Sequence, residues 1–285
     1  MATITIVLTL MGSLVALFLV GVHHAFRVPP RLETGSPDAF GLPFQAVRIP
    51  THRQRRLFAW WIPTRPGAPT VVILHGWGGN AEAMLPLAVP FHEARYNVLL
   101  LDAREHGRSD RDTFASLPRF AEDAGAAMDW VQAQADNPTG SLILLGHSVG
   151  AGAVLLEASR RRDVAAVVSI AAFGHPEWMM RRYLYQSHLP RPLHRLVQAY
   201  VQWLIGHRFE AIAPVSTIRR VDCPVLLVHG EEDVTVPIAD AECLAAVSEA
   251  VLLRIAGAGH DSVGKVEDHG SELIDFLHRV GVSPR

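Results

Sequence analysis

The feature that most constrains the fold is a short apolar run at 142–145 that ends in Gly-His-Ser-Val-Gly at 146–150. A G-x-S-x-G pattern between a strand and a helix places the serine on a sharp turn, because glycine on either side relieves steric crowding. Small residues follow at 151–153, as expected where a helix must start close to a strand. We therefore expect Ser148 to be presented at the edge of a sheet as a nucleophile.

A serine hydroxyl is a poor nucleophile near neutral pH, so it needs a base to take its proton and an acid to orient that base. In a strand-turn-helix arrangement of this kind the partners follow along the chain in the order serine, carboxylate, histidine. Asp233 and His260 each stand shortly after a later apolar run. We expect Ser148 as nucleophile, Asp233 as the orienting acid and His260 as the general base, with Glu232 as the alternative acid.

Two further loops follow apolar runs, His-Gly-Trp-Gly-Gly at 75–79 and Asp-Ala-Arg-Glu-His-Gly-Arg-Ser at 102–109. Together with the serine motif and its ordered partners, they resemble the loops of the α/β-hydrolase family of serine esterases and lipases. The resemblance runs from about Gln45 to the C-terminus. It implies an α/β fold, with a mostly parallel eight-stranded sheet, helices on both faces and a helical cap inserted at about 174–213.

The loop at 75–79 also has a chemical interpretation. Attack on a carbonyl creates an oxyanion, and each backbone N–H aimed at it can contribute about 3–4 kcal/mol. One donor is the residue after the nucleophile, here Val149 at the start of a helix, and the loop after the third strand supplies the other. We expect Trp77 to be that second donor. His75, His106 and His147 are expected to hold loops by hydrogen bonds.

Alternating apolar runs and amphipathic stretches organise the rest of the chain. Strands are predicted at 44–49, 57–62, 70–74, 97–101, 142–145, 164–171, 224–228 and 251–255. Helices are predicted at 117–134, 149–160, 238–248 and 266–280. This alternation predicts a mostly parallel sheet covered on both faces. The first two strands have no helix between them and are expected to pair antiparallel at one edge.

Composition excludes several classes of protein. A net charge of -2 without a long basic stripe argues against nucleic-acid binding. Cys223 and Cys243 do not form a disulfide framework, and each is expected to be a small buried hydrophobe. A partial phosphate-loop pattern at 259–265 lacks its magnesium-binding hydroxyl, because Val266 stands in that position. No cofactor and no metal ion are expected.

The N-terminus departs from a plain soluble hydrolase. The stretch from Ile4 to Val22 carries no charge and is long enough for a helix to cross a bilayer. No basic residue precedes it, and 21–26 contains no convincing small-x-small cleavage site, which disfavours a secretory signal. A membrane anchor at 1–27 is therefore expected, with a signal peptide and a helix buried on the domain as alternatives.

The residues after this stretch indicate its orientation. Arg27 and Arg31 follow the apolar run, and the positive-inside rule places that flank in the cytoplasm. Residues 28–43, rich in Pro and Gly, are predicted to be a linker to a hydrolase domain at 44–285. We thus expect a single-pass membrane protein whose catalytic domain is cytoplasmic.

The predicted cap is both basic and aromatic. Its arginines and aromatic side chains favour a surface that rests against anionic lipid headgroups and admits a lipidic or long-chain acyl substrate. Ordinary helix packing with exposed arginines is the alternative. The residues concerned are Trp178, Arg181, Arg182, Tyr183, Tyr185, Arg191 and Arg195.

The expected activity is hydrolysis of a small-molecule carboxylic ester by a serine hydrolase through an acyl-enzyme intermediate. The same triad would serve a thioesterase, an amidase or a peptidase, since the pocket rather than the triad selects the leaving group. A catalytically idle protein that binds a ligand or partner at the membrane is the alternative from another class.

Overall fold

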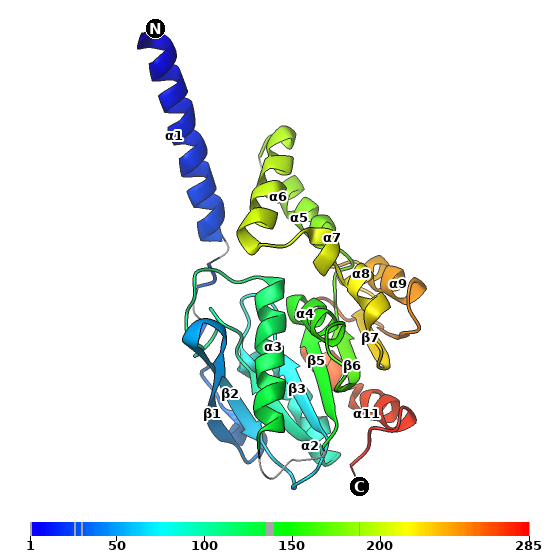
Figure 1. Cartoon of the computed structure of the whole chain (residues 1–285). Coiled ribbons are helices and arrows are strands. Elements are labelled where there is room, and N and C mark those ends of the chain that lie inside the picture. The colour runs from blue at the N-terminus through cyan, green and yellow to red at the C-terminus, as the bar shows by residue number, and fades with distance from the viewer. Residues whose placement is uncertain (1, 26, 30, 135–139, 188, 285) are drawn as a thin grey trace.

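The computed structural model describes residues 2–25, 27–29, 31–134, 140–187 and 189–284. A single eight-stranded sheet with the order β1-β2-β4-β3-β5-β6-β7-β8 runs through the domain (Figure 1). Its strands are β1 Gln45–Thr51, β2 Arg55–Ile62, β3 Thr70–Leu74, β4 Asn97–Leu101, β5 Leu142–His147, β6 Val164–Ile170, β7 Val225–Gly230 and β8 Val251–Ile255. Every predicted strand is present, and the predicted α/β fold class is confirmed.

Strand direction explains where the functional loops gather. β2 pairs antiparallel with both β1 and β4, and the other neighbouring strands pair in parallel. The antiparallel edge predicted for the first two strands is therefore confirmed. Only the short 3-10 turn η2 His52–Gln54 joins them, too few residues for a parallel crossover. The carboxyl ends of the parallel strands share one edge, so the loops after β3, β5, β7 and β8 meet there.

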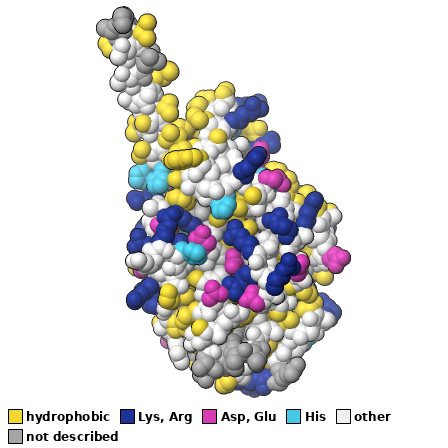
Figure 2. All heavy atoms as spheres, viewed as in Figure 1, with side chains coloured by type: hydrophobic (Ala, Val, Ile, Leu, Met, Phe, Trp, Pro, Cys, Tyr) yellow, Lys and Arg dark blue, Asp and Glu magenta, His cyan; other side chains and the backbone are white. Residues whose placement is uncertain are grey.

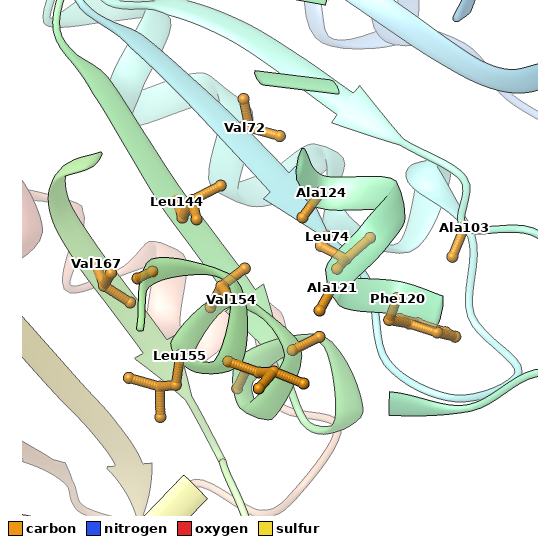
Figure 3. Close-up of a cluster of buried hydrophobic side chains, with 14 of the residues drawn as sticks. Val72, Leu74, Ala103, Phe120, Ala121, Ala124, Leu144, Val154, Leu155 and Val167 are labelled. Atoms are coloured by element: carbon orange, nitrogen blue, oxygen red, sulfur yellow. The ribbon is translucent and has the colours of Figure 1, made fainter. Parts of the chain in front are cut away.

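Helices cover both faces of the sheet. They are α2 Leu85–Glu93, α3 Leu117–Gln132, α4 Val149–Ala158, α9 Ile238–Ala246, α10 Val263–Glu267 and α11 Gly270–Arg279. α3, α4 and α9 contribute to one apolar core, and α2, α10 and α11 contribute to the other. Figure 3 shows part of the first core, where Val72 and Leu144 of the sheet face Ala124 of α3 and Val154 of α4.

Two helices differ from the sequence prediction. α2 was not predicted; Pro90 lies inside it, and proline disfavours a helix interior. The helix predicted at 266–280 is broken at Asp268 and His269 into α10 and α11. Gly270, which begins α11, allows close packing there, since a Cβ on it would lie 2.6 Å from Cβ of Pro90.

The cysteines correct a further prediction. Cys223 is half-buried and Cys243 is exposed, and both thiols are free. Cys243 lies on the solvent side of α9, whose buried positions include Ala241 and Leu244. The expectation of a buried position is therefore wrong for Cys243, because its residue type is outweighed by its place on the helix.

The insertion predicted at 174–213 contains helices between β6 and β7, with residue 188 outside the described part of the chain. They are α5 Pro176–Gln186, α6 Arg191–Ile205, α7 Phe209–Ile212 and, just beyond it, α8 Pro214–Thr217. Figure 1 shows α5 and α6 standing above the carboxyl edge of the sheet. We call α5 and α6 the cap helices.

The N-terminal helix α1 Ala2–Ala25 leaves the domain on the same side as the cap helices (Figure 1). Its segment Ile4–His24 is long and apolar enough to cross a membrane and is a candidate anchor. Residues 1 and 26 of the predicted anchor lie outside the described residues.

The segment 28–43 was predicted to be a linker, and the structure packs it against the domain, residue 30 lying outside the described part. Val28 is buried, and its carbonyl oxygen accepts a hydrogen bond from Arg111 at 3.2 Å. The backbone N–H groups of Thr34 and Gly35 both donate to Glu82, at 2.8 Å each. These contacts hold the described part of the segment against the domain.

Candidate active site

Ser148 stands at the junction of β5 and α4, where the sequence pattern places it. Its backbone has φ 54° and ψ -115°, a conformation that non-glycine residues rarely adopt. The Ser148 N–H donates to the carbonyl oxygen of Ile170 at 2.9 Å, which holds the turn against β6. Strain of this kind persists where surrounding structure fixes it and is frequent at functional positions.

The glycines of the motif permit close approach of three backbones. A Cβ on Gly150 would lie 2.5 Å from the carbonyl oxygen of His75 and 2.6 Å from that of Leu74. A Cβ on Gly146 would lie 2.7 Å from the backbone nitrogen of Ala151 and closer still to Gly150. The start of α4 can therefore pack between β5 and the end of β3 only if both positions lack a side chain.

A continuous chain of hydrogen bonds joins the three side chains expected to form the triad. His260 Nε2 lies 2.9 Å from Ser148 Oγ, and His260 Nδ1 lies 2.7 Å from Asp233 Oδ2. Asp233 Oδ1 accepts from the backbone N–H groups of Thr235 at 2.9 Å and Val236 at 2.7 Å. A carboxylate on Nδ1 fixes the proton there and leaves Nε2 free to accept the serine proton.

The environment of Asp233 keeps it ionised. Burial raises its pKa, but hydrogen bonds from His229, from His260 and from the Val236 N–H outweigh burial and lower the pKa below its ordinary value. Glu232, the alternative acid, is solvent-exposed, whereas Asp233 is 5% exposed.

His229 was not singled out from the sequence. It is buried at the end of β7, and its Nε2 lies 2.7 Å from the Val236 carbonyl oxygen and 3.5 Å from Asp233 Oδ2. The only sequence signal was its position inside the apolar run that leads to Asp233, which is typical of a core residue. His229 positions the loop that carries Asp233.

The loop at 75–79 curls directly beside the serine. The Gly79 N–H donates to the Gly76 carbonyl oxygen at 3.1 Å, and Gly78 has φ +73°. A Cβ on Gly76 would lie 3.1 Å from Cβ of Ser148. The tight turn places Trp77 between Gly76, which abuts Ser148, and Gly78.

Val149 is the first residue of α4, so its N–H is among the four at the helix start that have no acceptor within the helix. A helix N-terminus favours negative charge, which suits a developing oxyanion next to Ser148.

Three buried histidines tie the loops together, as the sequence predicts. His75 Nε2 accepts from the Ala103 N–H at 3.1 Å, and His106 Nε2 accepts from the Gly78 N–H at 3.1 Å. Burial is the main cause that lowers the pKa of both, that of His106 to about 4. Both rings are therefore neutral near neutral pH, the state in which a ring nitrogen can accept.

His147, His260 and Asp261 offer ligand atoms that all lie within 4.8 Å of one another. These histidine nitrogens already have other partners, since His147 Nε2 lies 2.8 Å from the His260 carbonyl oxygen and His260 Nε2 binds Ser148. A cation here would compete with the hydrogen bonds that orient the site, and the prediction of no metal stays a prediction.

The base of the cap is fixed next to this site. Arg182 of α5 binds Asp240 of α9 through two hydrogen bonds of 3.0 and 2.5 Å. The Gly174 N–H donates to the same carboxylate at 2.9 Å. The Trp178 ring packs against Gly174. A Cβ on Gly174 would lie 2.4 Å from the nearest ring atom, so a side chain there would displace the ring. Asp240 therefore holds both α5 and Gly174 against α9.

A mostly parallel eight-stranded sheet, with a strained serine between strand and helix and a carboxylate and histidine on later loops, defines an α/β hydrolase. Family comparison narrows this class: residues 66–217 match the family described as serine aminopeptidase, S33, and the chain belongs to that family.

Relatives and solved structures agree with the assignment. An uncharacterized protein of Mycobacterium tuberculosis is 27% identical over 244 residues, which cover 82% of this chain and 77% of that protein. The esterase Pf2001 of Pyrococcus furiosus has a TM-score of 0.72 at 22% identity, covering 89% of this chain and 97% of that one. A membrane phospholipase A, described as a bacterial virulence factor, has a TM-score of 0.64 at 20% identity, covering 98% and 99%. The family and these likenesses show a hydrolase with the α/β-hydrolase fold.

Proposed function

We propose that this protein is a serine hydrolase that cleaves carboxylic esters through an acyl-enzyme intermediate. The observation that carries the proposal is the unbroken hydrogen-bond chain from Ser148 Oγ through His260 to Asp233. A serine in a strained turn, an imidazole on its hydroxyl and an ionised acid behind the imidazole are the parts that nucleophilic acyl transfer needs.

In the acylation step, Ser148 Oγ attacks the carbonyl carbon while His260 Nε2 takes the hydroxyl proton. Asp233, which accepts the Nδ1 hydrogen bond, stabilises the imidazolium that forms. The carbonyl oxygen becomes an oxyanion, and the backbone N–H groups of Val149 and Trp77 donate to it, each worth about 3–4 kcal/mol in the transition state.

The tetrahedral intermediate then collapses, and the C–O bond to the alcohol breaks. The departing alkoxide takes the proton from His260, and the acyl group stays on Ser148. In deacylation, His260 takes a proton from water as its oxygen attacks the acyl carbon. The bond to Ser148 Oγ breaks, Oγ regains its proton from His260, and the carboxylic acid is released.

Similar proteins support an ester as the first candidate for the bond that is cleaved. The esterase among the solved structures supports an ester, and the family description supports a second candidate, an amide or peptide bond. Ser148, His260 and Asp233 would do the same chemistry on either substrate and on a thioester.

The placement in the cell is part of the proposal. Residues 1–27 would form a single-pass anchor, 28–43 the connection to it, and 44–285 the hydrolase domain with its cap at about 174–213. Arg27 and Arg31 are exposed beyond the apolar segment of α1, which favours a cytoplasmic catalytic domain.

The test uses the full chain in detergent micelles. It is exposed to a fluorophosphonate probe and to p-nitrophenyl esters of graded chain length, with acyl thioesters and aminoacyl p-nitroanilides assayed in parallel. Wild type should be labelled and should cleave the esters fastest. Ser148→Ala should abolish both, while Ser159→Ala, a matched control at the far end of the same helix, should change neither.

Failure of a folded wild-type chain to react with the probe would contradict the proposal and favour an idle binding protein. Labelling with preferential cleavage of the anilides would keep the serine hydrolase and replace the ester with a peptide substrate.

A further inference from the structure

One side of α1 packs against the cap. Phe18 and Val22, one helical turn apart, contact a small apolar cluster whose buried members are Val197 and Val201 of α6 and Phe209. Leu17 and Val20 of α1 are 69% and 52% exposed. In its C-terminal turns, α1 therefore packs one face against the protein and leaves its other faces exposed.

If α1 crosses a bilayer, its contact with α6 determines the depth of the cap relative to the bilayer surface. The apolar segment Ile4–His24 has 21 residues, and at 1.5 Å per residue it matches a hydrocarbon core of about 30 Å. Phe18 and Val22 lie in the last two turns of that segment, within about 9 Å of its end. Whatever packs on them must lie at the boundary between acyl chains and headgroups.

α6 is built for such a position because it has two apolar faces. His194, Val197 and Val201 are buried on the inner face. Leu196, Tyr200 and Trp203, at helical spacing, follow an outer face. Leu196 is 42% exposed, Trp203 is 75% exposed, and the Tyr200 ring stacks on Trp203 with centroids 5.7 Å apart.

An uncovered apolar stripe on a soluble surface is costly and marks a site of interaction. Figure 2 shows hydrophobic side chains along α1 and over the adjoining top of the cap, with basic side chains beside them. Trp and Tyr favour the membrane interface, where an apolar ring body and a polar group are both satisfied.

The charges around the stripe fit an anionic surface. Arg181 and Arg191 lie over the Tyr185 ring, 5.9 and 5.8 Å from its centroid, and Arg195 is exposed on α6. α6 contains no acidic residue. Arginines near an anionic leaflet are attracted to its surface charge.

We propose that α6 is a second membrane-contacting element, which meets the interface of an anionic bilayer beside α1. Leu196, Tyr200 and Trp203 enter the acyl boundary, and Arg181, Arg191 and Arg195 contact lipid phosphates. The cap is thereby held at the bilayer surface above the carboxyl edge of the sheet. This inference is independent of the bond that the enzyme cleaves.

The test measures immersion depth in the full chain reconstituted in vesicles. Cys223→Ser and Cys243→Ser remove both natural thiols, and a nitroxide is then attached in separate variants at Trp203→Cys, at Leu10→Cys in α1 and at exposed Ser271→Cys on α11. Collision with oxygen, which concentrates in lipid, is compared with collision with a water-soluble nickel chelate, in vesicles of phosphatidylcholine with and without phosphatidylglycerol.

With phosphatidylglycerol present, the label at position 203 should show an oxygen-to-nickel collision ratio several-fold above that at position 271. The label at position 10 should lie deeper still. The combined substitutions Arg181→Gln, Arg191→Gln and Arg195→Gln should return the ratio at 203 toward that at 271. Thermal unfolding of each variant checks that it is folded, and a misfolded label variant is replaced by Leu196→Cys.

Two results would overturn the inference. One is a label at 203 as open to nickel as that at 271 while the label at 10 is immersed. The other is strong spin–spin broadening between labels at 203, which would mean that a second copy of the chain covers α6.

Discussion

The His147 ring, next to Ser148 in sequence, donates a hydrogen bond from Nε2 to the backbone carbonyl oxygen of His260 at 2.8 Å. This bond connects the end of the strand before Ser148 to the loop that carries His260. Burial lowers the pKa of His147, so the ring is neutral near neutral pH, and the carbonyl acceptor places its single proton on Nε2. His147 therefore helps to hold His260 beside Ser148.

His147→Phe should reduce kcat about 10-fold with little change in KM, because His260 loses a contact that positions it beside Ser148. The free energy of unfolding should fall by about 1–2 kcal/mol, since a buried carbonyl loses its donor. Steady-state kinetics and urea unfolding measure both. His147→Gln, which keeps a donor, should recover most of the loss, and a Phe variant with wild-type kcat would refute the positioning role.

Asp233→Asn should lower kcat by about 10³ to 10⁴, because an amide facing His260 Nδ1 favours the tautomer that cannot accept the serine proton. The amide oxygen can still accept the Thr235 and Val236 N–H groups, so the melting temperature should change little. Glu232→Gln is the matched control and should retain activity. Equal losses in the two variants would show that the acid has been assigned wrongly.

The sequence predicts the sheet well because its central strands are buried on both faces and appear as continuous apolar runs. The four helices predicted at 117–134, 149–160, 238–248 and 266–280 are found as well, although the last is divided into α10 and α11. The differences are local: Pro90 lies inside α2, and the last helix is interrupted at Asp268 and His269, just before Gly270 packs against Pro90.

The residues that support the site are harder to predict from the sequence than the three residues of the expected triad. Ser148, Asp233 and His260 follow a fixed order at strand ends, so their meeting can be expected. His229 looks like a core residue within its strand, and Glu33 sits in a segment whose Pro and Gly predict a free linker. His229 gains its role from the conformation of the loop that follows it, which turns Asp233 back toward its ring. Glu33 gains its role when folding brings it from a distant segment to Asp102.

Gly150→Ala should destabilise the protein by about 1–3 kcal/mol or prevent folding, because the added methyl group would stand 2.5 Å from the His75 carbonyl oxygen in a packed backbone contact. Gly264→Ala in α10 is the matched control. A Cβ there meets nothing within 4 Å, so that variant should be stabilised by up to about 1 kcal/mol. Thermal unfolding compares the two, and a Gly150 variant as stable as its control would contradict the close packing.

Glu33 of the segment after α1 and Asp102 of the loop after β4 form a buried carboxyl pair. Burial, a hydrogen bond to Glu33 and its charge raise the pKa of Asp102 from 3.8 to about 8, although the Arg108 and Ala81 N–H groups oppose the change. The Glu33 carboxylate also pairs with Arg108 at 2.9 Å. The raised pKa means that the Asp102 carboxyl holds its proton in the folded state, which limits the repulsion between the two carboxyl groups.

This pair makes stability dependent on pH in a definite direction. The folded state holds the Asp102 proton up to about pH 8, whereas the unfolded state loses it near pH 3.8. The contribution of this pair to the free energy of unfolding is therefore full below pH 3.8 and is lost as the pH rises from 3.8 to about 8. Glu33→Gln removes the neighbouring charge, which lowers the pKa of Asp102, while burial still raises it. The free energy of unfolding is measured with urea in detergent at pH 6 and at pH 9. Between these two pH values it should fall by about 1 kcal/mol less in Glu33→Gln than in wild type. Exposed Glu249→Gln should leave the loss unchanged, and an equal loss in wild type and Glu33→Gln would mean that the two carboxyl groups do not interact.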